Sequence, residues 1–211
     1  MYSGDDDIAA TAARLVVEDG LDCGLAKRQA LQLLGLPART RLPDNDCVEA
    51  AVREHIAIFC ADTQPRELFA LRELALIWMG RLQPLRPYLA GAVWHGTATR
   101  LSDIVLQLFC DDAKAAELWL INHGQRYEVG SVRGFKGETV DVLSFSAHAE
   151  ALGEDIGIHL SVYDLDDLRG ALKPDSQGRK PRGDMEAVRQ LVSAQRRDAH
   201  NDLPATGGVH V

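Results

Sequence analysis

The spacing of apolar residues changes near residue 85, and this change restricts the chain to folds that combine a helical region with a sheet. Up to that point apolar residues recur every three or four positions, which is the helical period. Beyond it, short segments alternate apolar and polar residues, as strands with one buried face do. The sequence therefore predicts an α+β protein, with a helical region over residues 1–85, a domain with a small mixed β-sheet over residues 86–195 and a poorly ordered tail over residues 196–211.

Helices are expected throughout the first region. The first covers residues 6–18, the second ends at Gly35, the third begins after Pro43 with Asp44 or Asn45 as its N-cap, and the fourth covers residues 64–85. The fourth helix carries an apolar stripe, which indicates packing against the sheet or another helix. The stripe consists of Leu68, Leu71, Leu74, Ala75, Trp78 and Leu82.

The second region opens with strands on either side of a short connection. Residues 92–97 predict an apolar strand that ends in Gly96-Thr97, and the next strand opens with Ser102-Asp103-Ile104. The expected elements after these are a helix over 111–124, a hairpin over 125–146, a strand over 156–163, a short helix through Leu172 and a last helix after Asp184.

Aspartates stand at the strand positions where chemistry is expected. Because side chains alternate along a strand, Asp103 shares a face with Val105 and Gln107, while the residues between them enter the core. In the hairpin, Asp141 is a lone carboxylate on a strand whose other face is apolar. Each also has a structural interpretation, Asp103 as the end of a turn and Asp141 as a solvated strand residue.

A strand that ends in Gly-Thr, a short connection and a strand that opens with Ser-Asp resemble the signature of the DNA polymerase β-like nucleotidyltransferase superfamily. The resemblance covers the second half of the chain and implies a nucleotidyltransferase-like domain. It implies that Gly96 and Thr97 bind the triphosphate of an NTP and that Asp103 and Asp141 hold Mg²⁺, with Asp141 also catalytic. Val105 occupies the position at which the family places a second metal carboxylate.

Two functions follow from this resemblance, and the sequence leaves both open. The first is the transfer of a nucleotidyl group from an NTP, with Mg²⁺, to a hydroxyl or phosphate. The second is a non-catalytic module that binds a nucleotide or a protein on the same fold, because Val105 supplies no charge to a metal.

Charge and hydropathy narrow the class of partner. The formal net charge of −8 and the pI of about 5.3 argue against a broad nucleic-acid surface, which needs clustered Lys and Arg. We therefore expect a nucleotide, another small molecule or a protein as partner, a second copy of this chain included. No basic segment followed by an apolar run opens the sequence, and no apolar stretch approaches the roughly 20 residues of a membrane span, so we expect a cytoplasmic protein without a membrane partner.

A basic cluster stands out in this acidic chain. It comprises Lys173, Arg179, Lys180 and Arg182 within a Pro- and Gly-rich stretch. The cluster is either a loop over the site that neutralises a triphosphate or an exposed connection.

Overall fold

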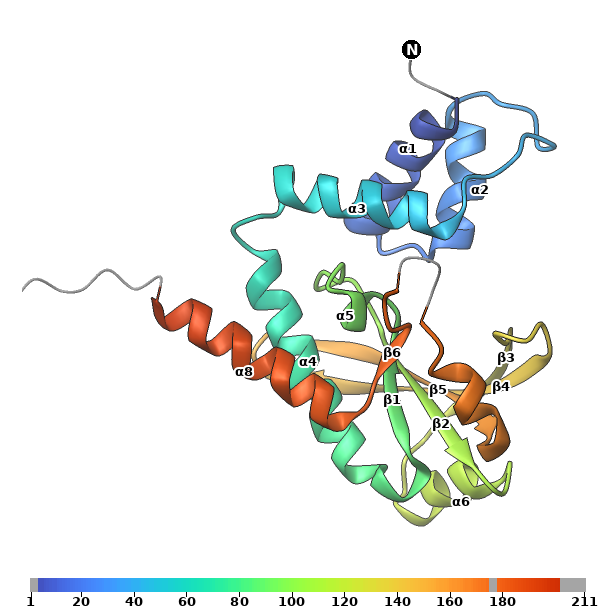
Figure 1. Ribbon diagram of the computed structural model, residues 1–211, viewed down its shortest axis with the longest axis vertical. Helices are drawn as coiled ribbons and strands as arrows, with labels where there is room; N and C mark the ends of the chain where they lie inside the picture. Colours follow the sequence, from blue (N-terminus) through green and yellow to red (C-terminus); the bar gives the residue numbers. More distant parts are fainter. Residues whose placement is uncertain (1–3, 175–177, 202–211) are drawn as a thin grey trace, which may run out of the picture.

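The computed structural model describes residues 4–174 and 178–201, which form helices followed by a mixed sheet with further helices (Figure 1). In chain order the elements are α1 (Gly4–Asp19), α2 (Cys23–Leu33), α3 (Asn45–Phe59), α4 (Gln64–Arg81), η1 (Gln83–Leu85), β1 (Pro87–Ala90), α5 (Gly91–His95), β2 (Ile104–Cys110), α6 (Ala115–Asn122), β3 (Glu128–Arg133), β4 (Thr139–Ala149), β5 (Glu154–Asp164), η2 (Leu165–Asp167), α7 (Leu168–Ala171), β6 (Arg182–Gly183) and α8 (Met185–Asn201). The expected α+β class is confirmed.

The described strands form one six-stranded sheet in the order β3-β4-β5-β2-β1-β6. β2 and β5 run parallel, and the other neighbouring strands run antiparallel. The register aligns three residues across the middle of the sheet, because Val105 lies opposite His159 and His159 lies opposite Ser144. Side chains on the same row and face of a sheet are close enough to interact.

Helices cover one face of this sheet. The strand residues that alternate toward that face, among them Ile104, Leu106 and Leu160, are fully buried. They share one hydrophobic core with the whole predicted stripe of α4 and with residues of α6 and α8. Figure 1 shows α8 lying along α4. The prediction that the stripe packs into the core is therefore confirmed.

A separate core lies between α1, α2 and α3. It is rich in alanine, which lets the helices approach closely, and it includes Ala12, Ala13 and Ala30. The predicted cap of the third helix is confirmed, since the Asp44 carboxylate accepts a hydrogen bond from the Cys47 amide at 2.7 Å. α4 packs with the sheet and not with this core.

The strand expected over residues 92–97 is wrong. The first strand is the earlier segment β1, and Gly91, with φ of +68°, turns the chain out of it into α5. The buried Arg72 of α4 closes this short helix, because its guanidinium donates to the carbonyl oxygens of Val93 and Trp94. An arginine on another helix decides this conformation, and local periodicity does not report it.

The other predicted elements are present, with changes at their ends. β2, the β3–β4 hairpin, α6 and β5 lie where the sequence places them. α8 begins after Asp184, whose carboxylate accepts from the Ala187 amide at 2.8 Å. It continues to Asn201, so residues 196–201 of the expected tail are helical, while residues 202–211 lie outside the described part of the chain. Within the described residues, no helix combines the length and apolar character that crossing a membrane requires.

Candidate functional site

The side of the sheet opposite α4 carries polar residues at its centre. The register places Ser144, His159, Val105, Ala90 and Arg182 in one row across β4, β5, β2, β1 and β6. Asp103 lies just before this row, and Gln107 and Ser161 lie in the next row on the same face. We call the polar residues of this surface the polar face; they are Asp103, Gln107, Ser144, His159, Ser161 and Arg182.

Asp103, His159 and Ser144 are hydrogen-bonded in series on the polar face. His159 Nε2 lies 3.0 Å from Asp103 Oδ2, and His159 Nδ1 lies 2.8 Å from Ser144 Oγ. The hydrogen bond from His159 lowers the pKa of the Asp103 carboxyl below its ordinary value, and a hydrogen bond from the Gly157 amide acts in the same direction. Asp103 is therefore a carboxylate at neutral pH, held by the strand beside it.

Arg182 is a buried cation at the other end of the row. Arg182 is 6% exposed. Its Nη1 donates to the Gln107 side chain, and its guanidinium lies over the Phe135 ring, with Cζ 4.9 Å from the ring centroid. Burial lowers the pKa of this guanidinium, and its Nε has no hydrogen-bond partner among the described residues. No acidic side chain pairs with Arg182 within residues 4–174 and 178–201.

α5 fixes the position of β6 and hence of Arg182. Trp94 Nε1 donates to the Lys180 carbonyl oxygen at 2.7 Å. The Trp94 ring lies against Gly183, where any Cβ would collide with it. Of the predicted basic cluster, Lys180 is an exposed connection, whereas Arg182 is a buried strand residue on the polar face.

Asp141 lies on the opposite face of the sheet from Asp103. It alternates with Val142, which faces Ser161, and it shares its face with the core residue Leu143. The hydrogen bond from Lys114 to Glu117 and the charge of Glu117 raise the pKa of Lys114 at the start of α6, and the charge of Asp141 adds to this to a smaller extent. Along the strand direction, Asp141 is also about five residues, or roughly 16 Å, away from the row that contains Asp103. The structure does not bring the two predicted metal ligands together.

The residues around Asp103 do not fit a magnesium site of the implied kind. A divalent cation of this class is held by several oxygen ligands. Here the residue beside Asp103 on the same face is Val105, and the residue facing Val105 on β5 is His159, which is bonded to Asp103. Among the described residues, no group of three or more His, Cys, Asp and Glu side chains is arranged to hold a metal ion.

The backbone groups of Gly96 and Thr97 make hydrogen bonds within the chain. Both backbone amides donate to the Ala92 carbonyl oxygen, at 2.9 and 3.0 Å, so neither is available to a phosphate. The Gly96 carbonyl accepts from Gln64 of α4 at 3.1 Å. The glycine that directly follows the first strand is Gly91, and a Cβ there would lie 3.7 Å from Val105.

Thr97 lines a cavity of about 340 Å³ between α5 and the helices α1 to α3. Glu49 and Asp46 also line it and pair with Arg179 at 3.2 and 2.9 Å. Because carboxylates repel a triphosphate and already occupy this arginine, the cavity does not suit the ligand that the resemblance implies.

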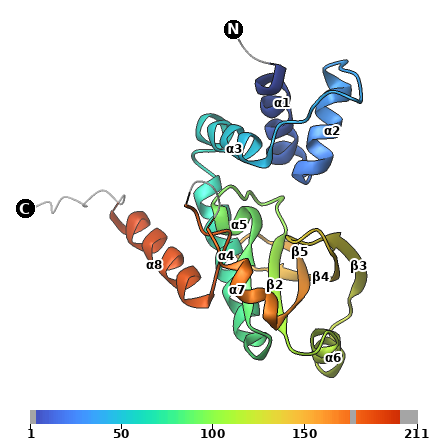
Figure 2. The ribbon, with the colours of Figure 1, turned by 45° about the vertical axis from the view of Figure 1, so that its right-hand side comes forward.

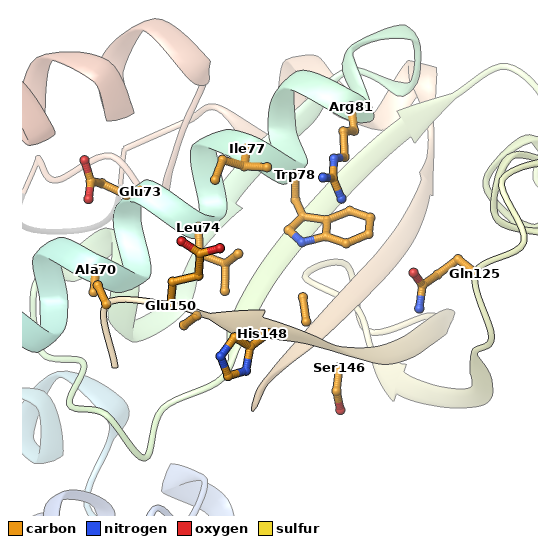
Figure 3. A pocket seen from close by; sticks show the side chains of 13 residues that line it. Ala70, Glu73, Leu74, Ile77, Trp78, Arg81, Gln125, Ser146, His148 and Glu150 are labelled. Atoms are coloured by element: carbon orange, nitrogen blue, oxygen red, sulfur yellow. The ribbon is translucent and has the colours of Figure 1, made fainter. Parts of the chain in front are cut away.

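A second hollow lies on the helix-covered face, between α4 and the end of β4, with a volume of about 810 Å³. Figure 3 shows Leu74 and Trp78 on its α4 wall and His148 on the opposite wall. None of the predicted site residues lines it.

Comparison with known protein families, curated proteins and solved structures finds no match to this chain. The residues themselves therefore carry the functional interpretation.

Sequence reasoning missed two residues of this site, His159 and Ser144, and named a third, Arg182, without its strand position or its burial. His159 lies on the polar side of the alternation in β5, but its contacts come from two other strands. Ser144 is visible only once the hairpin is paired with β5. Arg182 stands in a Pro- and Gly-rich stretch with no strand pattern, so its burial is not visible in the sequence.

Proposed function

We propose that this chain is a binding module that holds a nucleotide, or another phosphorylated small molecule, on the polar face without magnesium-dependent nucleotidyl transfer. The observation that carries the proposal is Arg182, a buried guanidinium without an acidic partner in the described part of the chain. A buried charge is costly unless it is paired. A phosphate bound at this guanidinium would supply the missing negative partner.

The surroundings of Arg182 favour a nucleotide among phosphorylated ligands. Phe135 lies over the guanidinium and packs against Tyr163 with ring centroids 4.9 Å apart. Phe135 is 39% exposed at the turn between β3 and β4, so part of its ring can stack on a base. Gln107 adds an amide that can donate to a phosphate or to a base edge.

The carboxylates argue against metal-dependent transfer. That reaction needs several carboxylates that hold metal ions against the reacting phosphate. On the polar face one oxygen of Asp103 is bonded to His159, and no group of three or more His, Cys, Asp and Glu side chains among the described residues is arranged to hold a metal ion. The arrangement therefore favours binding of a ligand over metal-dependent transfer.

Thermal unfolding with ATP, GTP, CTP and UTP, each with and without Mg²⁺, tests the proposal. Ligand at a hundred times its Kd stabilises the native state by about 2.7 kcal/mol, which raises the Tm of a chain of this length by about 5–10 °C. We expect a shift that does not require Mg²⁺ and that Arg182→Gln abolishes. Lys180→Gln removes a neighbouring exposed charge and should keep the shift.

Other outcomes would overturn the proposal. A shift that needs Mg²⁺ and disappears in Asp103→Ala supports nucleotidyl transfer instead. No shift with any nucleotide favours the module that binds a protein. Because Arg182→Gln could alter the fold, its urea midpoint without ligand is compared with that of wild type, and nucleotide affinity is also measured by calorimetry below the Tm.

A further inference from the structure

The series Ser144, His159 and Asp103 has the order of contacts that activates a serine. A nucleophile bonded to a base, with the base oriented by a third group, is the arrangement that allows a hydroxyl to attack an electrophile at neutral pH. The serine lies 2.8 Å from one imidazole nitrogen, and the carboxylate lies 3.0 Å from the other. This series lies on the same polar face as the proposed nucleotide site but involves neither Arg182 nor Phe135, so the two proposals rest on different residues.

The sheet builds this series from neighbouring strands. Ser144 of β4 lies directly opposite His159 of β5, and β2 follows on the other side of β5. Asp103, just before β2, reaches across the backbone of β5 at Gly157. A Cβ at residue 157 would collide with the Asp103 carboxylate, so a glycine there leaves the space that the contact with His159 requires.

The hydrogen-bond chemistry fixes the direction of proton transfer. An ionised carboxylate only accepts hydrogen bonds, so the contact with Asp103 places the imidazole hydrogen on Nε2. When the ring is neutral, Nδ1 then has a lone pair that can accept from the Ser144 hydroxyl. Ser144 therefore faces a base, and the base is held in the correct tautomer.

The series is open to solvent. The His159 side chain is 35% exposed and the Asp103 side chain is 54% exposed. Ser144 is partly exposed, and the residue two positions further along the same face, Ser146, is exposed. A small electrophile can reach the serine without movement of the sheet.

We propose that Ser144 is a reactive nucleophile that accepts the acyl group of small carboxylic esters. Its Oγ bonds to the carbonyl carbon while its proton passes to His159 Nδ1. The carbon–oxygen bond of the ester then breaks, and the proton passes from His159 to the departing alcohol. Water hydrolyses the acyl-serine by the same route, which returns the proton to Ser144 and releases the acid. Asp103 is a positioning residue that acts through His159.

An alkyl fluorophosphonate probes this nucleophile directly. The Ser144 oxygen bonds to phosphorus, the phosphorus–fluorine bond breaks, fluoride leaves and the hydroxyl proton passes to His159. We expect intact-mass spectrometry to show one adduct and peptide mapping to place it on Ser144. Ser144→Ala should remove it, whereas Ser146→Ala, the matched serine on the same strand and face, should label at the wild-type rate.

The variants of the other two residues test their roles. His159→Gln should lower the labelling rate by about 100-fold or more, the contribution of a general base. Asp103→Asn should lower the maximal rate of inactivation and leave the probe concentration for half-maximal rate unchanged, since Asp103 orients the base without touching the probe. The rate at which wild type and each variant release p-nitrophenol from p-nitrophenyl acetate should rank the proteins in the same order with an ester.

Labelling of wild type in urea supplies the baseline for an unactivated serine. Folded protein that labels no faster than this baseline, an adduct on another serine, or a His159→Gln variant that labels at the wild-type rate would each overturn the proposal. The first two of these outcomes need only the wild type and so hold even where a variant fails to fold. If nucleotides do not raise the Tm, the labelling result is unaffected, because thermal unfolding with nucleotides tests the role of Arg182.

Discussion

Replacing Gly157 with alanine tests whether β5 is shaped around the Asp103 carboxylate. The added Cβ would lie 2.7 Å from Asp103 Cγ, closer than two carbon atoms can pack, and 3.2 Å from Oδ2, which is a tight contact. Asp103 has a short side chain, so it must rotate away and give up its hydrogen bonds with His159 and the Gly157 amide. The cost of the substitution should therefore be the loss of these contacts.

The expected magnitude combines two opposing effects. A hydrogen bond to a charged group contributes about 1.5–3 kcal/mol. Replacing glycine by alanine in a compatible backbone conformation recovers about 0.4–1 kcal/mol by restricting the unfolded chain. Gly157→Ala should therefore lower the free energy of unfolding by about 1–2 kcal/mol. Gly130→Ala on β3, where a Cβ meets nothing within 4 Å, should leave it unchanged or raise it.

Urea denaturation of a double-mutant cycle isolates the contact. In the Asp103→Ala background there is no carboxylate to displace, so Gly157→Ala should cost nothing there and should resemble Gly130→Ala. If Gly157→Ala destabilises the protein equally in both backgrounds, the collision is with something other than Asp103 and the reasoning is refuted. A slower fluorophosphonate reaction of Gly157→Ala would connect the same contact to Ser144.

Further substitutions probe the core, the short helix and the acid range. Leu71→Ala should lower the free energy of unfolding by about 2–5 kcal/mol, because Leu71 is fully buried on α4. Ile77→Ala, at an exposed position of the same helix, should lower it by about 1 kcal/mol or less. Equal urea midpoints for the two variants would contradict this. Arg72→Met leaves the Val93 carbonyl and the Gln195 amide oxygen without their donor and should cost about 2–4 kcal/mol, checked by calorimetry; an unchanged Tm would refute the role of Arg72 in holding α5. Asp103 has a lowered pKa, so its stabilising effect is complete well above pH 3.8 and is lost as the pH falls through the folded value. The difference in stability between wild type and Asp103→Asn should therefore be larger at pH 7 than at pH 3, and a constant difference would exclude this linkage.

Patterns within single segments predicted most of the fold. The stripe on α4, the cap at Asp44 and the alternation around Ile104 depend on neighbouring residues and on burial, and the structure confirms them. The prediction of a strand over 92–97 was wrong because, over so short a length, the apolar residues fit the helical period as well as the strand period. Contacts from Arg72, which is distant in sequence, decide for the helix.

The candidate site was predicted only in part. The alternation correctly placed Asp103 beside Val105 and Gln107 on one face. It could not place Asp141 relative to Asp103, because the register between β4, β5 and β2 decides whether the two carboxylates lie on the same face of the sheet. A shift of one residue in that register would exchange the faces, and no local pattern fixes it. For the same reason the sequence could not show that Ser144 and His159 meet.

The two separate cores imply that the chain does not open as one cooperative block. The α1 to α3 core is built largely of small side chains, and Figure 2 shows these helices standing apart from the sheet. The larger core of the sheet and α4 should have the higher free energy of local opening. Backbone amides of α1 to α3 should then exchange with deuterium before those of β2 and β5, and a ligand on the polar face should slow exchange in the strands alone.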